Sequence, residues 1–413
     1  MERPLEDDEV GRIDRILGRL RRVTTTGRYV PQVDGVRFIA ITTVFLFHVT
    51  RLLYDEYPGN RARPFGEAEA TDLGMRFLRE GRFGVMVFFA LSGFILALPF
   101  VSARLGGGRP VSLRAYFLRR VTRIEPPYLV ALVLVTVLAL TIDAWGPPSG
   151  VGARFAAGVW YGHTFVYGVP NLLNPPFWTL EIEVQFYVLM PVLALVCFRG
   201  DRARRRRAAI AAAAVAVTLV QATIGARLGP GHPLGILPSY LQWFLIGFLV
   251  ADAFVVDWRG VPHPSRAWDV VSLVGWPAFF FLAANEDALT YVVLPWVLLP
   301  LFVAVFRGRW TGRALGNRWV TTIGGMTYSI YLVHTPVIDL LGRQTSRLFD
   351  TYTTGTVLAQ AALLAPVVLA AGLAFFVAIE RPCMRPGWPA ELRRKVASWR
   401  RGGSERAEQP VRA

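Results

Sequence analysis

The stretch Asp34–Val49, DGVRFIAITTVFLFHV, is the first strongly apolar run of the chain, and it carries a charged side chain, Arg37, and a titratable one, His48. Such groups are costly inside a membrane-spanning helix, so by default they mark a functional path rather than packing. Their separation makes about three helical turns, which returns His48 to within roughly 20° of the face of Arg37, about 16 Å further along the axis. The sequence therefore predicts a membrane helix with a cation at one depth and a proton acceptor at another.

The composition is that of a polytopic membrane protein. Of the 413 residues, 53% are hydrophobic, and the mean hydropathy is +0.39. Apolar runs recur at about the length of 20 residues that a bilayer crossing needs. We predict an all-α fold with about ten transmembrane helices, and we expect a re-entrant or interfacial piece at 151–168. The ten spans are expected at 36–53, 84–101, 127–142, 178–198, 208–226, 238–256, 268–284, 289–306, 320–339 and 356–379.

The arginines predict the orientation of the chain, because short cytoplasmic loops carry an excess of Lys and Arg. With the predicted spans, 18 loop arginines fall on one side of the membrane and nine on the other. We therefore expect a multi-pass protein of the cell membrane with both termini cytoplasmic.

Three regions follow from this topology. We expect a cytoplasmic tail with an amphipathic basic helix at 1–30, the ten-span membrane domain at 31–382, and a basic cytoplasmic tail at 383–413. The N-terminal helix should lie on the inner membrane surface. Its apolar stripe consists of Ile13, Ile16, Leu17 and Leu20.

The formal net charge of +16 would suggest a nucleic-acid partner in a soluble protein. Here topology and attraction to anionic lipid explain most of it, so membrane lipids rather than nucleic acid are the expected partners. The two cysteines, Cys197 and Cys383, both fall near the predicted cytoplasmic face, where a disulfide is not expected. We expect no metal site and no permanently bound cofactor.

Three ionisable groups on three predicted helices share one depth. His48 lies about 9 Å below the outer boundary of its span. Glu183, in NPPFWTLEIEVQFYVLMP, and His334, in TYSIYLVHTPV, lie at similar depths in spans of their own. Equal depth permits contact between these side chains without requiring it, since helices are free to rotate and tilt.

The chemistry that suits these groups is general base catalysis. A neutral imidazole can take the proton of a hydroxyl as that hydroxyl attacks a carbonyl, and a nearby carboxylate can hold the ring. We therefore predict His48 as the base and Glu183 as its orienting group or as a substrate ligand. At the inner end of the third span, the segment YFLRRVTRIEPPY supplies planar guanidinium groups that match phosphate. We predict that this segment, through Arg119, Arg120 and Arg123, binds an anionic donor together with Arg37.

Each of these residues could also have a purely structural role. Arginines just inside a span, such as Arg119, are often topology anchors. A histidine near a helix end, such as His334, is more often packed than catalytic, although we keep it as a candidate substrate ligand. Glu183 could pair with an arginine merely to hold helices together. Glu181 lies on another face of its helix and nearer the outer surface, so we expect it to be interfacial.

The order of these motifs resembles that of the acyltransferase-3 family of integral-membrane acyltransferases, from about Gln32 to Pro382. The matching blocks, in order, are DGVR with its following histidine, GVMVFFALSGFIL, FLRRVTRIEPPYL, WTLEIEVQFYVLMP, YLQWFLIGFLVA, TYSIYLVHTPV and ERP. The resemblance implies that Arg37 and His48 are required for activity, and it maps the family's acidic residue to Glu183. The family's basic inner segment maps to Arg120 and Arg123.

The resemblance also implies an activity. Members of this family are thought to take acyl groups from acyl-CoA at the cytoplasmic face and to place them on hydroxyls of sugars, lipids or small natural products. We therefore predict an acyl-CoA-dependent O-acyltransferase, with acetyl-CoA or another short-chain acyl-CoA as co-substrate and a hydroxyl-bearing, sugar-containing acceptor.

Two other classes of protein remain open from the sequence. A transporter or lipid flippase would equally need many spans and intramembrane charges. It would move its substrate without consuming acyl-CoA. A non-enzymatic membrane sensor or scaffold would leave the matched depths of His48, Glu183 and His334 unexplained.

Overall fold

The computed structural model describes residues 18, 20, 29–54, 72–142, 150–169, 171, 173–225, 237–285, 288–349, 353–385, 387–391 and 394. Within these ranges every regular element is a helix, which confirms the predicted all-α class. The elements are α2 (Pro31–Tyr54), α4 (Leu73–Arg79), η1 (Glu80–Phe83), α5 (Gly84–Leu105), α6 (Leu113–Thr141), α7 (Val151–Val159), α8 (His163–Tyr167), η3 (Pro175–Phe177), α9 (Trp178–Cys197), α10 (Ala203–Val220), η4 (Gln221–Gly225), α12 (Leu241–Val256), α13 (Arg266–Ala283), α14 (Ala288–Arg307), α15 (Arg309–Leu315), α16 (Arg318–Gly325), α17 (Thr327–Thr345), η6 (Ser346–Leu348), α18 (Thr354–Phe375), η7 (Phe376–Glu380) and α19 (Arg381–Cys383).

Six helical segments of the described ranges are long and apolar enough to cross a membrane. They are Pro31–Arg51, Leu73–Leu105, Leu113–Thr141, Pro175–Cys197, Leu289–Arg307 and Thr354–Cys383. The four other predicted spans are also helical, as α10, α12, α13 and α17, but they are shorter or less apolar. The count of ten and the orientation of the termini therefore stay predictions. The predicted apolar stripe at 13–20 lies outside the described residues, apart from positions 18 and 20.

Two predicted spans differ from the observed helices, and the predicted re-entrant or interfacial segment consists of short helices. Helix α6 begins at Leu113 rather than near 127, so the basic segment before the third span is part of the helix itself. The ninth predicted span is divided at Met326 into α16 and α17. The segment 151–168 contains two short helices, α7 and α8, each too short to cross a bilayer.

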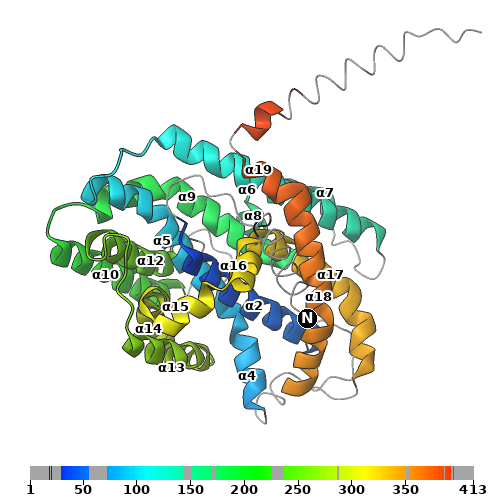
Figure 1. Ribbon diagram of the computed structural model, residues 1–413. Coiled ribbons are helices and arrows are strands. Elements are labelled where there is room, and N and C mark those ends of the chain that lie inside the picture. Colours follow the sequence, from blue (N-terminus) through cyan, green and yellow to red (C-terminus); the bar gives the residue numbers. More distant parts are fainter. Residues whose placement is uncertain are drawn as a thin grey trace, which may run out of the picture.

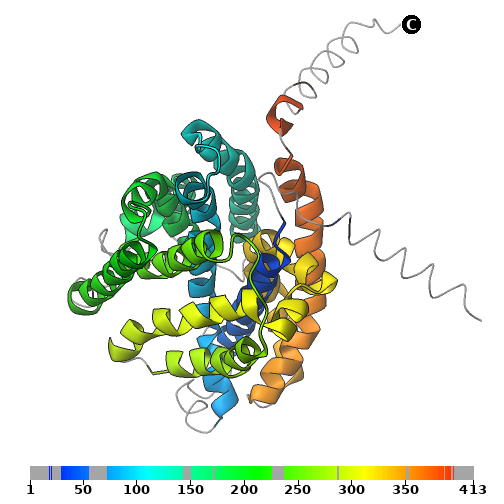
Figure 2. The same cartoon turned by 60° about the vertical axis from the view of Figure 1, so that its left-hand side comes forward.

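Helix α2 lies inside the bundle, as both views show, with α5 on one side and α16, α17 and α18 on the other (Figures 1 and 2). Its residues Val36, Ala40 and Val44 recur at one face and are buried. Near its start α2 crosses α16 in backbone contact, because a side chain at Gly324 would overlap the carbonyl oxygen of Asp34. The helix that carries Arg37 and His48 is thereby enclosed by several others.

Helices α5 and α12 make an equally close crossing. A Cβ atom at Gly93 would overlap the backbone of Phe244, and one at Gly247 would overlap the backbone of Ala90 and Phe94. Small residues let membrane helices approach closely, so the glycines of GVMVFFALSGF are explained by packing. Aromatic rings pack beside this crossing, where Phe244 is stacked on Phe89 and Phe186.

Candidate active site

Arg37 and His48 lie on one unbroken helix, as the sequence predicts, since α2 runs from Pro31 to Tyr54. The helical rise separates them by about 16 Å along its axis. The two residues therefore belong to two different parts of the site, which are built from different neighbouring helices.

Around Arg37 the structure places a buried acidic partner one turn earlier. Arg37 Nη1 donates a hydrogen bond to Asp34 Oδ1 at 2.5 Å, and the Asp34 side chain is only 4% exposed. A buried charge of this kind requires a partner, and removing either member of such a pair is strongly destabilising. The DGVR motif thus presents a guanidinium that its own helix already holds in place.

Two further charged residues from other helices lie within electrostatic range of this pair, and a third lies near one of them. Arg123 of α6 interacts electrostatically with Glu380, Arg37 and Asp34. Glu183 of α9 interacts in the same way with Arg37. We call these five residues, Asp34, Arg37, Arg123, Glu183 and Glu380, the Arg37 cluster. It combines two cations with three carboxylates, and it joins α2 to α6, α9 and the π-helical turn η7.

Glu183 is held within this cluster by two hydroxyl groups. Its Oε1 accepts a hydrogen bond from Ser92 Oγ at 2.8 Å, and its Oε2 accepts one from the Tyr187 hydroxyl at 2.7 Å. The sequence predicts Glu183 as the orienting group of His48 or as a substrate ligand, and in the structure its carboxylate oxygens bind Ser92 and Tyr187 instead of the His48 ring. The expectation rested on depth alone, whereas the rotation of α9 directs the carboxylate towards Ser92 and Arg37.

His48 instead contacts His334. Their rings meet edge to face, with centroids 4.9 Å apart. His334 Nδ1 donates to the carbonyl oxygens of Tyr331 and Ile330, at 2.8 and 3.2 Å, because a backbone carbonyl can only accept. In the neutral ring this leaves Nε2 as the acceptor, which lies 3.2 Å from Thr335 Oγ1. The equal depth predicted for His48 and His334 permits this contact without requiring it, and the structure shows the contact.

His334 is fully buried, and both of its ring nitrogens have partners within the protein. Its neighbour Tyr331 is also fixed, since the Tyr331 hydroxyl lies 2.6 Å from the carbonyl oxygen of Pro176 and 2.7 Å from Thr179 Oγ1. These contacts make His334 a support for His48. Its expected role as a direct substrate ligand stays a prediction.

A cavity of about 320 Å³ opens beside His48. Helix α2 contributes Phe47, His48 and Arg51 to its wall, and Trp178 and Tyr331 face it from α9 and α17. Its volume falls in the range of small-molecule sites, and such sites are mostly apolar with a few placed polar groups. His48 therefore lies on the wall of a cavity with aromatic sides, together with the arginines Arg51 and Arg82.

The three predicted donor-binding arginines of α6 have different surroundings. Arg120 lies over the ring of Tyr116, 3.8 Å from its centroid, and its Nη1 donates to the carbonyl oxygen of Tyr116 at 3.0 Å. Its buried Nε has no hydrogen-bond partner in the described part of the chain. Arg119 is half-buried, whereas Arg123 belongs to the Arg37 cluster. The structure thus brings Arg123, but not the whole basic segment, to Arg37.

Sequence reasoning missed several residues of the site. Asp34 and Tyr331 could have been found, because each stands three residues before a predicted site residue on the same helix face. Glu380 of the closing ERP motif also has a clear place, since its Oε2 accepts hydrogen bonds from Ser329 N and Oγ, at 3.0 and 2.5 Å. No local pattern marks Ser92 or Tyr187 as the partners of Glu183.

Two polar residues near the predicted outer surface are buried in the structure. Glu181 is buried rather than interfacial, because its Oε2 accepts a hydrogen bond from the backbone N–H of Thr164 at the start of α8. His163, in the segment expected to be re-entrant or interfacial, is fully buried and lies 3.3 Å from Arg154 Nη1. Both residues are buried because α7 and α8 cover this end of the bundle.

Comparison with known proteins agrees with the family resemblance predicted from the sequence. A family profile described as an acyltransferase domain matches residues 30–381. Acyltransferase MdmB of Streptomyces mycarofaciens is 28% identical over 396 residues, which cover 86% of this chain and 92% of the relative. A Staphylococcus aureus (strain COL) protein named "Putative O-acetyltransferase" is 22% identical over 335 residues, which cover 76% of this chain and 51% of the relative. The chain thus spans about half the length of this second relative.

A third relative is more distant. Peptidoglycan O-acetyltransferase OatA of Listeria monocytogenes is 24% identical over 188 residues, which cover 43% of this chain and 26% of the relative. No solved structure matches the chain.

Proposed function

This chain belongs to the acyltransferase-3 family, and from that premise we propose that it moves an acyl group from acyl-CoA to a hydroxyl of a sugar-containing acceptor. Membership of an acyltransferase family makes the chain an enzyme. It therefore argues against the transporter and scaffold alternatives. A relative named for peptidoglycan O-acetylation supports the sugar-containing acceptor.

One observation carries the proposal. His48 lies on the wall of a cavity with aromatic sides, it is supported by the fixed ring of His334, and it shares its helix with Arg37. Aromatic faces such as Trp178 suit an amphipathic acceptor, because they offer a large apolar surface next to polar groups. The cavity is thus the proposed acceptor site.

In the proposed reaction His48 is the general base. It takes the proton of the acceptor hydroxyl while the hydroxyl oxygen attacks the thioester carbonyl. The carbon–sulfur bond breaks, coenzyme A leaves as the thiolate, and the proton on His48 passes to that thiolate. His334 acts through His48 as a positioning residue in this scheme, because its own nitrogens are occupied.

The donor is proposed to reach His48 from the Arg37 end of α2. Arg37 and Arg123 would bind its phosphates, since guanidinium forks match phosphate. Arg119 and Arg120 would add further positive charge at the same donor-binding site. A long flexible pantetheine arm suits the distance of about 16 Å from Arg37 to His48. In this scheme Glu183 sets the charge balance at Arg37 rather than orienting His48.

The test is turnover of purified protein with acetyl-CoA and a panel of sugar acceptors, followed by release of the free thiol of coenzyme A. We expect His48→Gln to lower turnover by at least about a hundredfold, while affinity for acetyl-CoA is retained, because only the proton transfer is removed. The matched control is His263→Gln, at an exposed histidine outside the cavity, which should behave like the wild type. Wild-type turnover by His48→Gln would refute the mechanism.

A further inference from the structure

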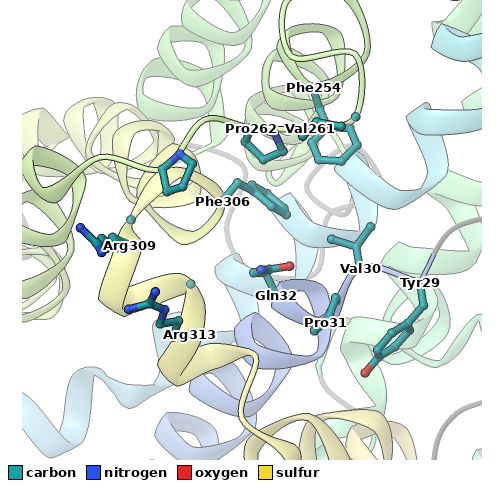
Figure 3. Close-up of a pocket in the computed structure, with 14 residues that line it drawn as sticks. Tyr29, Val30, Pro31, Gln32, Phe254, Val261, Pro262, Phe306, Arg309 and Arg313 are labelled. Carbon is teal, nitrogen blue, oxygen red and sulfur yellow. The ribbon is translucent and has the colours of Figure 1, made fainter.

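A second cavity, of about 440 Å³, lies at the start of α2 (Figure 3). Its lining includes Gln32 of α2, Phe254 and Phe306 at the ends of α12 and α14, and Arg309 and Arg313 of α15. Five residues separate Gln32 from Arg37, which turns their faces about 140° apart on the helix. The cavity therefore opens beside a different face of α2 from the one that carries Arg37.

The lining combines an apolar floor with a basic rim. Phe254 and Phe306 are buried and meet at 5.5 Å between ring centroids. Arg309 and Arg313 stand one helical turn apart and are exposed, and neither guanidinium enters an ion pair within the part of the chain that the structure describes. The lining thus matches a ligand that has both an anionic and an apolar part.

The carboxylate that contacts α15 is already used by the backbone. Asp269 Oδ1 accepts hydrogen bonds from the N–H groups of Trp310 and Thr311, both at 2.9 Å. It therefore caps the start of α15, and the two arginines remain as the charged groups of the rim.

Exposed tryptophans place this region at the level of lipid headgroups. Trp310 of α15 is 61% exposed and Trp319 of α16 is 50% exposed. Arg266 lies 5.9 Å from the centre of the Trp310 ring. Exposed tryptophans in a membrane protein gather at the membrane–water interface. Basic pockets between helices at this level bind anionic lipid headgroups.

We propose that this cavity binds an anionic phospholipid, with its phosphate on Arg309 and Arg313 and its glycerol and upper acyl part against Phe254 and Phe306. The nucleotide of coenzyme A also offers phosphates. The interfacial tryptophans and the separation from the Arg37 face favour the lipid. The site is distinct from the proposed active site, and it does not depend on the proposed activity.

The test measures lipid bound to the purified full-length protein by native mass spectrometry. The probes are phosphatidylglycerol and phosphatidylcholine with identical acyl chains. We expect tighter binding of phosphatidylglycerol, and we expect R309Q/R313Q to weaken it by at least about tenfold, because charged hydrogen bonds to the phosphate are lost. The matched control is R109Q/R114Q, which removes the same charge from exposed arginines outside the cavity and should bind as the wild type does.

A second variant fills the space instead of removing charge. A Cβ atom at Gly312 would lie 3.6 Å from Val305 O and 3.8 Å from Gln32 Nε2, which is ordinary contact, so G312L should fold. Its side chain should occupy part of the cavity and lower phosphatidylglycerol binding as R309Q/R313Q does. Equal binding of the two lipids, or unchanged binding in both variants, would overturn the proposal.

Competition separates the two sources of phosphate. If the cavity is a lipid site, neither free coenzyme A nor inorganic phosphate should displace phosphatidylglycerol. Displacement by coenzyme A that is lost in R309Q/R313Q would assign the cavity to the nucleotide and refute the lipid proposal.

Discussion

At the scale of single residues, the polar groups of α2 form two separate sets, the Arg37 cluster near its start and His48 with His334 further along. Asp34 binds Arg37 directly, while Glu183 accepts hydrogen bonds from Ser92 and Tyr187. Charged groups inside a membrane protein persist when partners compensate them. In the proposed mechanism the cluster acts on the donor, and the cavity beside His48 acts on the acceptor.

Variants of Arg37 and Glu183 should show this separation. Arg37→Lys keeps the charge but loses the planar fork, so affinity for acyl-CoA should fall by about tenfold to a hundredfold. Glu183→Gln keeps the shape but removes a negative charge near Arg37, so it should change affinity for acyl-CoA more than turnover. Donor titration and steady-state kinetics on the same preparations measure both quantities.

The control for this pair is Arg114→Lys, at an exposed arginine near the start of α6. It should keep wild-type affinity and turnover. If Arg37→Lys also keeps wild-type affinity in correctly inserted protein, Arg37 is a structural anchor paired with Asp34, and the proposed donor contact is wrong.

At the scale of helices, one carboxylate joins two elements that are far apart in the sequence. Asp72 Oδ1 accepts hydrogen bonds from Gly74 N and from Thr354 Oγ1, and its Oδ2 accepts one from Thr354 N at 2.8 Å. It therefore caps α4 and the start of α18 together. The hydrogen bonds from Thr354, the hydroxyl first and the backbone N–H second, hold the pKa of Asp72 below its ordinary value.

A lowered pKa gives this contact a defined pH dependence. The ionised form stabilises the folded state at pH values above the ordinary pKa, and this contribution is lost as the pH falls through the lowered pKa. We expect Asp72→Asn to be less stable than the wild type by about 1 kcal/mol at neutral pH, because an amide cannot replace both charged oxygen acceptors of the Thr354 hydrogen bonds. The difference should shrink below about pH 4.

Thermal unfolding midpoints of the wild type and of Asp72→Asn in one detergent, from pH 7 downwards, test this prediction. Thr353→Ala is a useful comparison, since it removes the cap within α18 but no ionisable group. The decrease in its unfolding midpoint relative to the wild type should be independent of pH over the same range. If the difference in unfolding midpoint between Asp72→Asn and the wild type stays constant on acidification, ionised Asp72 is not the source of the stabilisation.

At the scale of the whole molecule, the arginine bias predicts which end of the bundle faces the cytoplasm. In a protein whose own Cys197 and Cys383 are replaced, Asn60→Cys and Gly152→Cys should react with a membrane-impermeant thiol reagent added to intact cells. Arg109→Cys and Arg202→Cys should react only after the membrane is opened. Labelling of Arg202→Cys in intact cells would show that the orientation is opposite to the predicted one. The donor would then enter from the other face of the membrane.

The sequence alone determined the all-α membrane class, the placement of Arg37 and His48 on one helix, and the resemblance to a family that the comparison then confirmed. These inferences succeed because the helical rise and the rotation per residue are local properties that any continuous helix keeps. The identity of the buried partner of Arg37 was also within reach, since Asp34 stands one turn away on the same helix.

The tertiary structure decided which side chains meet. It placed His334 rather than Glu183 against His48, brought Arg123 but not the whole basic segment to Arg37, and buried Glu181 under α8. Lipid is as apolar as the interior of the bundle, so the hydrophobic pattern of a membrane helix does not reveal which face it turns inward. The rotation of each helix follows instead from close packing at residues such as Gly93, Gly247 and Gly324, whose neighbours lie far away in the sequence.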